Sequence, residues 1–300
     1  GGCGFIGSHL VEKLLAKGDR VTVVDNMCVG SKDNLPEHQN LKVINADILD
    51  DIDEYFKGVS VVYHLAALTR PQESIDDPEE FTVVNVQGTL QVLRFSKRQK
   101  VKRVVFTSST ALYGEQDILP TPETAIPNPM SPYALTKLCG EQYCQLYNKM
   151  YGLEYNIIRP FNVYGLRQDP HSGYAAAIPK FIDTLNKKEV PYITGDGKQS
   201  RDFIYVGDVV DQMILMATSK VNGEAFNAGS GNSTSINDIY SMVCKLMGTN
   251  TLPNHVKAVF EPSQTLGAID KAEFMLGWKP KVGLEEGLKL TIKETNARCS

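Results

Sequence analysis

Apolar residues in the first 160 positions alternate between two patterns. Nearly continuous apolar runs rich in β-branched residues predict buried strands at 20–25, 41–47, 59–67, 102–109 and 153–160. Between these runs, apolar residues recur at helical spacing and predict helices over 9–17, 81–99 and 131–151. Apolar strands separated by helices are typical of a parallel sheet covered on both faces. The pattern therefore predicts an α/β fold, a doubly wound (Rossmann-type) parallel sheet with its ligands at the carboxyl ends of the strands.

The pattern changes after residue 165, where shorter elements and turn-rich stretches run to a last helix near 283–296. We expect two domains: a dinucleotide-binding domain over 1–165 and a smaller, mixed substrate-binding domain over 166–300. Part of 196–221 is expected to return to the first domain. The proline-rich stretch 119–132 excludes a helix and predicts an ordered loop that crosses the site.

Composition narrows the function classes. The 300 residues are 42% apolar and carry a net charge of −4, which does not favour binding to nucleic acid or to anionic membranes. No apolar run is long enough to cross a bilayer. The six cysteines form no CxxC pair, so we expect no metal site and free thiols in a reducing cytoplasm.

The first residues, GGCGFIGSH, contain glycines at positions 2, 4 and 7 in the GxGxxG spacing. A helical pattern follows at once, and the next strand ends in Asp25, at about the 20-residue spacing of a dinucleotide-binding fingerprint. Such glycines let the backbone approach a pyrophosphate at a helix N-terminus. The carboxylate of the acidic residue accepts a hydrogen bond from the adenosine ribose. An Asp there repels a 2′-phosphate, so NAD is favoured over NADP. The alternative is a glycine-rich turn beside an unrelated Asp.

Two features near this turn remain open. The strand that normally precedes such a turn is absent from the sequence, so we expect several β-forming residues before Gly1 in the natural protein. Asp47 ends the third predicted element and is either an adenine contact or a simple turn residue.

Tyr133 and Lys137 stand one helical turn apart in SPYALTK, where Ser131 and Pro132 suit a helix N-cap and first position. An ammonium group near a phenol lowers its pKa, so Tyr133 could act as a base on a sugar or alcohol hydroxyl. Ser109, at the end of the preceding predicted strand, belongs to the same edge of the sheet. Taken alone, a Tyr/Lys pair is more often plain helix surface.

Eight segments occur in the order seen in extended short-chain dehydrogenases/reductases: GGCGFIGSHL, VVDN, HLAA, NVQGT, FTSSTALYG, SPYALTK, IRPFNVYG and RDFIYVGDV. The chain resembles the NAD-dependent nucleotide-sugar epimerase/dehydratase members of that family, most closely those that are UDP-glucose or UDP-N-acetylglucosamine 4-epimerases. The resemblance covers almost the whole chain.

The resemblance implies roles for the catalytic set. Tyr133 would take the proton of the sugar 4-hydroxyl, and Ser109 would form a hydrogen bond with the 4-oxygen. Lys137 would hold the nicotinamide ribose and lower the pKa of the tyrosine. Asn85 would be structural or close to the cofactor. The implied NAD-binding residues are Gly1, Gly4, Phe5, Ile6, Gly7, Asp25, Asn26, Asp47, Ile48, Leu65, Ala66, Ala67, Tyr133 and Lys137.

The reaction is inferred from what the chain lacks. Dehydratases of the family usually carry Thr-Asp-Glu where this chain has Ser109, Thr110 and Ala111. Without that acid–base pair, C4 epimerisation through a transient 4-keto sugar is the expected reaction. The alternatives are UDP-glucuronate epimerisation or decarboxylation, dehydration, or a non-catalytic NAD-binding scaffold.

The resemblance also implies the substrate residues. Asn162 would bind the diphosphate, Arg201 the nucleotide ribose or phosphate, and Tyr192 would lie near the base, although Arg201 could instead pair with Asp202. Thr265, a small residue, would leave room for an N-acetyl group. A family arginine expected after Pro262 is missing from the sequence, and the family usually forms homodimers through helices such as 81–99 and 131–151.

Overall fold

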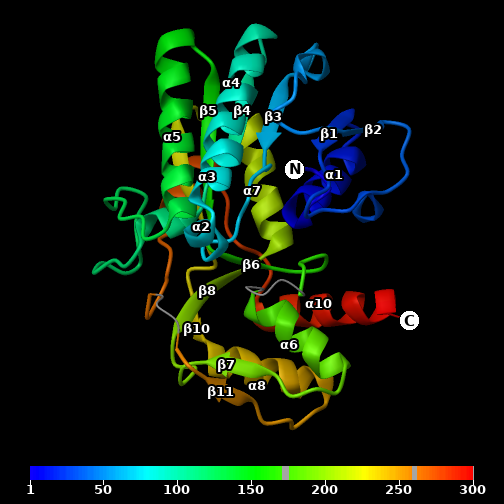
Figure 1. The fold of residues 1–300 in the computed structure, drawn as a ribbon, viewed down its shortest axis with the longest axis vertical. Coiled ribbons are helices and arrows are strands. Elements are labelled where there is room, and N and C mark those ends of the chain that lie inside the picture. Colours follow the sequence, from blue (N-terminus) through cyan, green and yellow to red (C-terminus); the bar gives the residue numbers. More distant parts are fainter. Residues whose placement is uncertain (171–175, 259–261, 300) are drawn as a thin grey trace.

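The computed structural model describes residues 1–170, 176–258 and 262–299, without the side chains of 297–299. A helix-covered parallel sheet forms one part of the molecule, and a smaller mixed unit packs below it in the view of Figure 1. This arrangement confirms the predicted doubly wound α/β fold. None of the described helices is both long and apolar enough to cross a membrane.

The main sheet has the strand order β3-β4-β5-β9, and all three pairings are parallel. Its strands are β3 (Val61–His64), β4 (Arg103–Thr107), β5 (Glu154–Pro160) and β9 (Glu224–Ala228). The first three confirm the predicted runs, although β3 is shorter than expected. Strand β9 comes from beyond residue 165, so a late segment of the chain completes the sheet.

Strands β1 (Val21–Asp25) and β2 (Leu41–Asn45) form a separate parallel pair. Gly1 lies between this pair and the main sheet. Its amino nitrogen donates to the carbonyl of Val24 at 2.8 Å, and a Cβ on it would stand 2.4 Å from the backbone nitrogen of Ala66.

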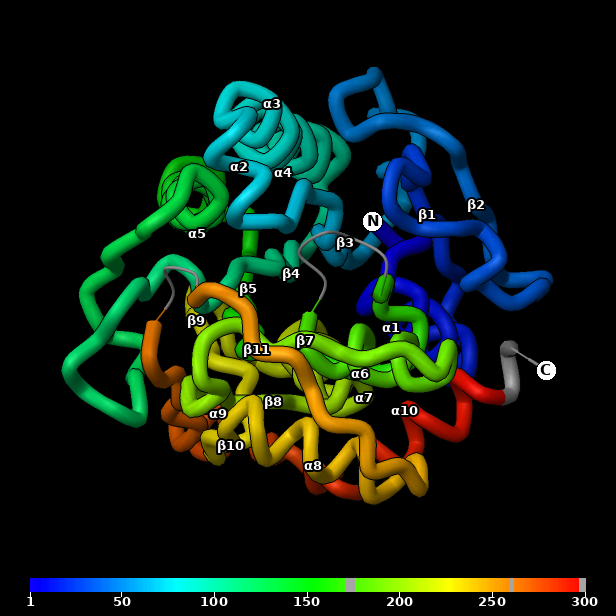
Figure 2. Tube along the Cα trace, turned by 60° about the horizontal axis from the view of Figure 1, so that its bottom comes forward, coloured from blue at the N-terminus to red at the C-terminus, as the bar shows by residue number. Residues whose placement is uncertain are grey.

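Helices cover both faces of the main sheet because its strands are apolar on both sides. Alternate residues of β4 point in opposite directions: Val105 packs with α1 (Phe5–Ala16) and α7 (Val206–Thr218), whereas Phe106 packs with α4 (Gly88–Arg98) and α5 (Pro132–Tyr151). Figure 2 shows α4 and α5 side by side, away from the smaller unit. Short helical segments complete this part: η1 (Lys32–Asn34), η2 (Asp53–Phe56), α2 (Glu73–Asp76), α3 (Pro78–Thr82), η3 (Val83–Gln87) and η4 (Thr110–Tyr113).

The smaller unit contains two short sheets with the orders β10-β8-β6 and β11-β7. Their strands are β6 (Asn162–Tyr164), β7 (Tyr192–Thr194), β8 (Ser200–Tyr205), β10 (Ser233–Ser235) and β11 (Asn254–Val256). Its helices are α6 (Ala177–Asn186), α8 (Ile236–Met247) and α10 (Leu284–Cys299), whereas α9 (Asp270–Leu276) packs against α7 and β9 of the main sheet. Phe181, Tyr240 and Leu288 belong to the apolar cluster that joins α6, α8 and α10.

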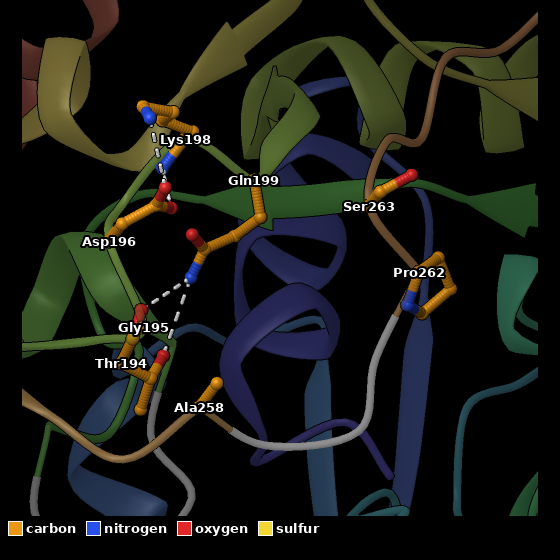
Figure 3. A pocket seen from close by; sticks show the side chains of 8 residues that line it. All are labelled: Thr194, Gly195, Asp196, Lys198, Gln199, Ala258, Pro262 and Ser263. Atoms are coloured by element: carbon orange, nitrogen blue, oxygen red, sulfur yellow. Dashed lines mark hydrogen bonds and ion pairs between the residues drawn. The ribbon is translucent and has the colours of Figure 1, made fainter.

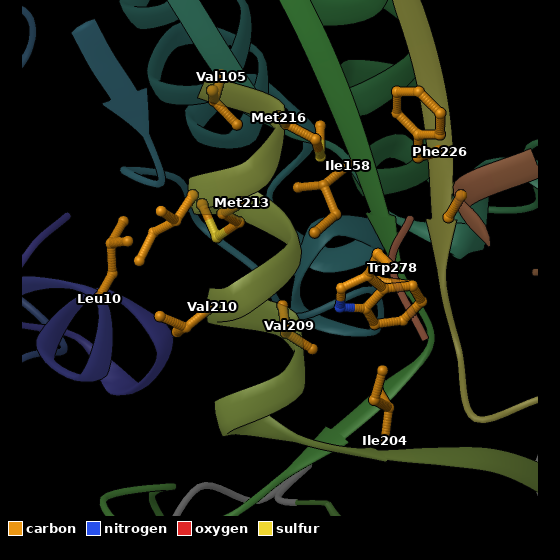
Figure 4. Close-up of a cluster of buried hydrophobic side chains, with 13 residues drawn as sticks. Leu10, Val105, Ile158, Ile204, Val209, Val210, Met213, Met216, Phe226 and Trp278 are labelled. Carbon is orange, nitrogen blue, oxygen red and sulfur yellow. The ribbon is translucent and has the colours of Figure 1, made fainter. Parts of the chain in front are cut away.

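A shared core connects the two parts. Trp278, which follows α9, packs with Val209 of α7 and Ile204 of β8, and Leu10 of α1 belongs to the same cluster (Figure 4). The indole nitrogen of Trp278 donates to the carbonyl of Asp208 at 3.1 Å. Helix α7 therefore lies with the main sheet although it follows residue 165, and it fixes the smaller unit to that sheet.

Helix α5 approaches β4 closely at Gly140. A Cβ at this position would lie 2.4 Å from Cζ of the Phe106 ring, which is itself buried. Only a residue without a side chain lets this helix sit so near the sheet.

The substitution Gly140→Ala should therefore lower the free energy of unfolding by about 1–3 kcal/mol, the usual loss for overpacking a core. Alanine is the better helix former by about 1 kcal/mol, so a loss would come from packing. Urea unfolding followed by the fluorescence of the single tryptophan measures the change. Gln145→Ala, at an exposed position of α5, is the control and should stay within about 0.5 kcal/mol. Equal or higher stability of Gly140→Ala would contradict the packing argument.

Candidate functional site

A cavity of about 1200 Å³ lies between the main sheet and the smaller unit. One part of its lining comes from the glycine turn and from the residues at the carboxyl ends of β1 to β5. The other part comes from β6, α6, β7 and β8. This is the edge at which a doubly wound sheet holds its ligands.

The glycine turn is packed backbone against backbone. A Cβ on Gly7 would lie 2.2 Å from the carbonyl oxygen of Gly1, so no other residue fits there without a shift. Gly4 caps α1 without a side-chain hydrogen bond, and residues 4–7 line the cavity. The first turn of a helix thus faces the cavity with its backbone N–H groups, which is a favourable environment for a diphosphate.

Asp25 is buried beside this turn. Its Oδ2 accepts a hydrogen bond from the backbone nitrogen of Cys3 at 2.9 Å, and its Oδ1 accepts one from that of Met27 at 2.8 Å. The carboxylate therefore connects the end of β1 to the glycine turn while also lining the cavity.

Asp47 is a turn residue that also lines the cavity, and its expected contact with adenine stays a prediction. It lines the cavity, and its Oδ1 accepts from the backbone nitrogen of Leu49 at 2.8 Å as a turn residue does. Its Oδ2 accepts from Nδ2 of Asn26 at 2.7 Å. These two side chains fix the ends of β1 and β2 relative to each other.

The lining fits a dinucleotide. Each of the residues expected to contact NAD, from Gly1 to Lys137, lines the cavity. The turn offers backbone donors, Asp25 offers a buried carboxylate, and Ile48 and Leu65 offer apolar walls. Gly30, which sequence reasoning missed, also lines it: a Cβ there would lie 2.5 Å from the carbonyl carbon of Cys3.

Ser109, Tyr133 and Lys137 line the cavity together. Ser131 caps α5 by accepting from the backbone nitrogen of Ala134 at 3.2 Å, and Pro132 occupies the first turn, as predicted. Tyr133 and Lys137 are buried on one face of the helix. The hydroxyl of Ser109 makes a hydrogen bond with Tyr133.

Burial shifts the pKa values of Tyr133 and Lys137 in opposite directions. Burial raises the pKa of Tyr133, and the hydrogen bond with Ser109 only partly opposes this rise. Lys137 Nζ donates to the carbonyl of Thr107 at 2.9 Å and stands 5.9 Å from the centre of the Tyr133 ring. Burial lowers the pKa of Lys137 to about 8. In this structure loss of solvent is the largest influence on the pKa of Tyr133, and the effect expected of Lys137 stays a prediction for the NAD-bound site.

Two further hydroxyls belong to the site. Thr107 Oγ1 and Ser108 Oγ are buried, line the cavity and have no hydrogen-bond partner within the described part of the chain. Thr110 Oγ1, in contrast, donates to the carbonyl of Pro160 at 3.1 Å. Buried hydroxyls are normally paired, so the first two are available to a ligand.

Asn85 is a structural residue beside the site. Its amide exchanges two hydrogen bonds with the backbone of Leu68, at 2.8 and 2.9 Å, and donates to Thr136 Oγ1 at 3.0 Å. It lies in a π-helical turn, so the single helix predicted over 81–99 is divided into α3, η3 and α4. The divided helix lets one side chain connect the loop after β3 to α5.

The predicted substrate residues lie on the other side of the cavity. Asn162, Tyr192 and Arg201 line it, whereas Thr265 does not. Asn162 Nδ2 donates to Thr265 Oγ1 at 3.4 Å, so the two side chains are still brought together. The carboxylate of Asp202 accepts from the backbone nitrogens of Ser230, Gly231 and Gly267.

Lys180 and Gln168 line the same side and were not predicted. Lys180 Nζ contacts the hydroxyl of Tyr192 and stands 4.0 Å from the centre of its ring. A lysine in the amphipathic helix α6 gives no sequence signal that separates it from ordinary surface charge.

A smaller cavity of about 420 Å³ adjoins the first, and Thr194 and Gln199 line both (Figure 3). Gln199 Nε2 donates to the carbonyl of Thr194 at 2.8 Å.

The place after Pro262 where the family arginine was expected adjoins residues 259–261, which lie outside the described residues.

Comparisons with known proteins agree with this geometry. Residues 1–229 match the model of the NAD dependent epimerase/dehydratase family. A protein of Methanocaldococcus jannaschii with the provisional name UDP-glucose 4-epimerase is 42% identical over 297 residues, which cover 97% of this chain and 95% of that protein.

Two solved structures are also similar. One is the UDP-N-acetylglucosamine 4-epimerase of Methanobrevibacter ruminantium M1 in complex with UDP-N-acetylmuramic acid, with 36% identity, a TM-score of 0.96 and coverage of 99% of this chain and 96% of that one. The other is the UDP-glucose 4-epimerase of Thermotoga maritima with UDP-glucose, with 36% identity, a TM-score of 0.95 and coverage of 100% and 98%. The chain therefore belongs to the NAD-dependent epimerase/dehydratase family.

Proposed function

We propose that the protein is an NAD-dependent UDP-hexose 4-epimerase that acts through a transient 4-keto sugar. The observation that carries this proposal is the meeting of Ser109, Tyr133 and Lys137 in one cavity. One side of that cavity fits a dinucleotide, and its other side carries the residues inferred to hold a nucleotide sugar.

Each of the three residues has a distinct role in the proposed reaction. Tyr133 takes the proton of the sugar 4-hydroxyl and later returns it. The hydroxyl of Ser109 donates a hydrogen bond to the 4-oxygen while that oxygen belongs to a ketone. Lys137, held by the carbonyl of Thr107, binds the nicotinamide ribose. When bound, NAD supplies the hydride acceptor and donor for C4 and a positive ring that favours the tyrosinate.

The residues around this set favour epimerisation over elimination. The positions next to Ser109 are Thr110, whose hydroxyl is bonded to the Pro160 carbonyl, and Ala111, which has no acidic group. A dehydratase needs a further acid and base to remove water across C5–C6. Epimerisation needs only the proton and hydride exchange at C4, with a turn of the ketone between the two transfers.

For the substrate, we infer that Asn162 binds the diphosphate, Arg201 the nucleotide ribose or phosphate, and Tyr192 the region of the base. Arg201 is buried on β8 and lines the cavity, where a guanidinium pairs well with anionic oxygen. Thr265, in contact with Asn162, is small enough to leave room for an N-acetyl group.

A homodimer through α4 and α5 is part of the proposal. It is supported by large apolar side chains exposed on α5, namely Leu135, Leu146, Met150 and Tyr151. A cytoplasmic location is also proposed, and it is supported by the free thiols of Cys3, Cys28, Cys139, Cys144 and Cys244.

The activity is tested by incubating the purified protein with UDP-glucose, UDP-galactose and their N-acetylated forms, without added NAD. We expect interconversion within at least one pair, because no net oxidation occurs and bound NAD is recycled. Separation of the products by chromatography measures it. Absence of interconversion in both pairs, from protein that contains NAD, would exclude the 4-epimerase.

The substitution Tyr133→Phe should reduce kcat by about 10²–10⁴-fold, the usual contribution of a positioned base, while bound NAD is retained. Turnover and the nucleotide content of the purified protein are measured together. Tyr143→Phe is the matched control on the same helix and should keep full activity, since Tyr143 does not line the cavity among the described residues. Retained activity of Tyr133→Phe would refute the role of this tyrosine.

A further inference from the structure

A buried arginine, Arg159, stands at the carboxyl end of β5, next to the cavity but with no assigned part in the reaction. Its Nε donates to Oε1 of Glu141 at 2.8 Å, and its Nη2 donates to Oε2 at 2.6 Å. Glu141 is 1% exposed and Arg159 is 6% exposed. Two parallel hydrogen bonds between a guanidinium and a carboxylate fix both distance and orientation.

Glu141 lies on the same face of α5 as Tyr133 and Lys137. Tyr133, Lys137 and Glu141 follow one another at intervals of four residues, so they occupy the same side of the helix. The pair with Arg159 therefore fixes the rotation of α5 about its axis and its position along β5. Both of these determine where the Tyr133 hydroxyl stands.

The same guanidinium also holds the turn that carries Ser109. Arg159 Nη1 donates to the hydroxyl of Tyr113 at 2.8 Å. Tyr113 ends η4, and Ser109 caps the start of η4 by accepting from the backbone nitrogen of Ala111 at 3.1 Å. Because η4 is only four residues long, the position of Tyr113 constrains that of Ser109.

The network continues towards the substrate side. Arg159 Nη1 donates to the carbonyl of Glu123 at 2.9 Å, in the proline-rich loop. The Tyr113 hydroxyl donates to Oδ1 of Asn227 at 2.7 Å, and Asn227 Nδ2 donates to the carbonyl of Ala268 at 3.1 Å. Residue 268 belongs to the segment that carries Thr265.

We propose that Arg159 is a positioning residue for the reaction: by holding Glu141 of α5 and Tyr113 of η4 with one guanidinium, it sets the distance between the hydroxyls of Tyr133 and Ser109. This inference rests on the proposed epimerase function. Burying an ion pair is expensive, and apolar side chains of similar volume often give equal or better stability. The positioning of α5 and η4 accounts for a buried charged residue at position 159.

A second buried arginine provides a matched control. Arg103, at the start of β4, pairs with Glu154 through Nη2 at 2.7 Å and is 3% exposed. Its Nη1 donates to backbone carbonyls at the end of α7 and beyond, including that of Met216 at 2.9 Å. Arg103 therefore resembles Arg159 in its own burial and in pairing with a glutamate, although Glu154 accepts through Oε2 alone and is partly exposed. It lies at the opposite end of the sheet from the cavity.

The first test compares Arg159→Lys with Arg103→Lys, because lysine keeps the charge and loses the forked geometry. We expect kcat per folded, NAD-containing site to fall at least about ten-fold in Arg159→Lys, since small displacements of reacting groups are costly. KM should change by less than about three-fold, and Arg103→Lys should keep kcat within about two-fold. Equal kcat values for the two variants would overturn the proposal.

The second test uses Tyr113→Phe, which removes one buried hydroxyl and remains decisive if Arg159→Lys does not fold. Its control is Tyr155→Phe on β5, which loses a hydrogen bond from its hydroxyl to the carbonyl of Gly223, at 3.1 Å. We expect a fall in kcat without a matching change in KM for Tyr113→Phe only. Equal effects in both variants would overturn the proposal. An inactive wild-type protein would instead contradict the proposed function itself, so the two failures are distinguishable.

Discussion

The packing of α5 against the main sheet is the constraint on which the site depends. Gly140 lets the helix approach Phe106, and the buried pair between Glu141 and Arg159 fixes the helix on β5. Lys137 then reaches the carbonyl of Thr107, and Tyr133 reaches the hydroxyl of Ser109. A rotation of α5 by a fraction of a turn would break all of these contacts at once, because the residues that make them share one face of the helix.

This arrangement places chemistry and stability in opposition. The protein buries a phenol and an ammonium group, and loss of solvent raises the pKa of Tyr133 and lowers that of Lys137. Both shifts disfavour the charged forms that the proposed reaction uses. Buried groups with displaced pKa values are typical of functional sites, where the surrounding fold must supply the stability that the site does not. Here the shared core around Trp278 and α7 supplies it.

The sequence predicted β3, β4 and β5 of the main sheet, the cap of α5 and the residues that line one side of the cavity, because apolar periodicity and the glycine spacing report local structure directly. It did not predict β9. It did not predict the π-helical turn at Asn85, since that break depends on hydrogen bonds to Leu68 and Thr136, which are distant in sequence. It also did not predict that Lys180 lines the cavity or that Arg159 forms hydrogen bonds with Glu141 and Tyr113. Their roles arise from which elements the fold brings together, and a single side chain in a helix or strand carries no sign of that.

In the proposed reaction, C4 of the sugar is oxidised and reduced within the site whose catalytic residues α5 positions. The most direct measurement follows a deuterium at C4 of UDP-glucose through turnover in ordinary water, with mass spectrometry of the UDP-galactose formed; the N-acetylated pair is used if that is the active one. We expect the product to keep the deuterium, because a hydride that is transferred and returned never exchanges with solvent. Loss of the label to water would contradict the hydride mechanism and, with it, the roles given to Tyr133, Ser109 and Lys137.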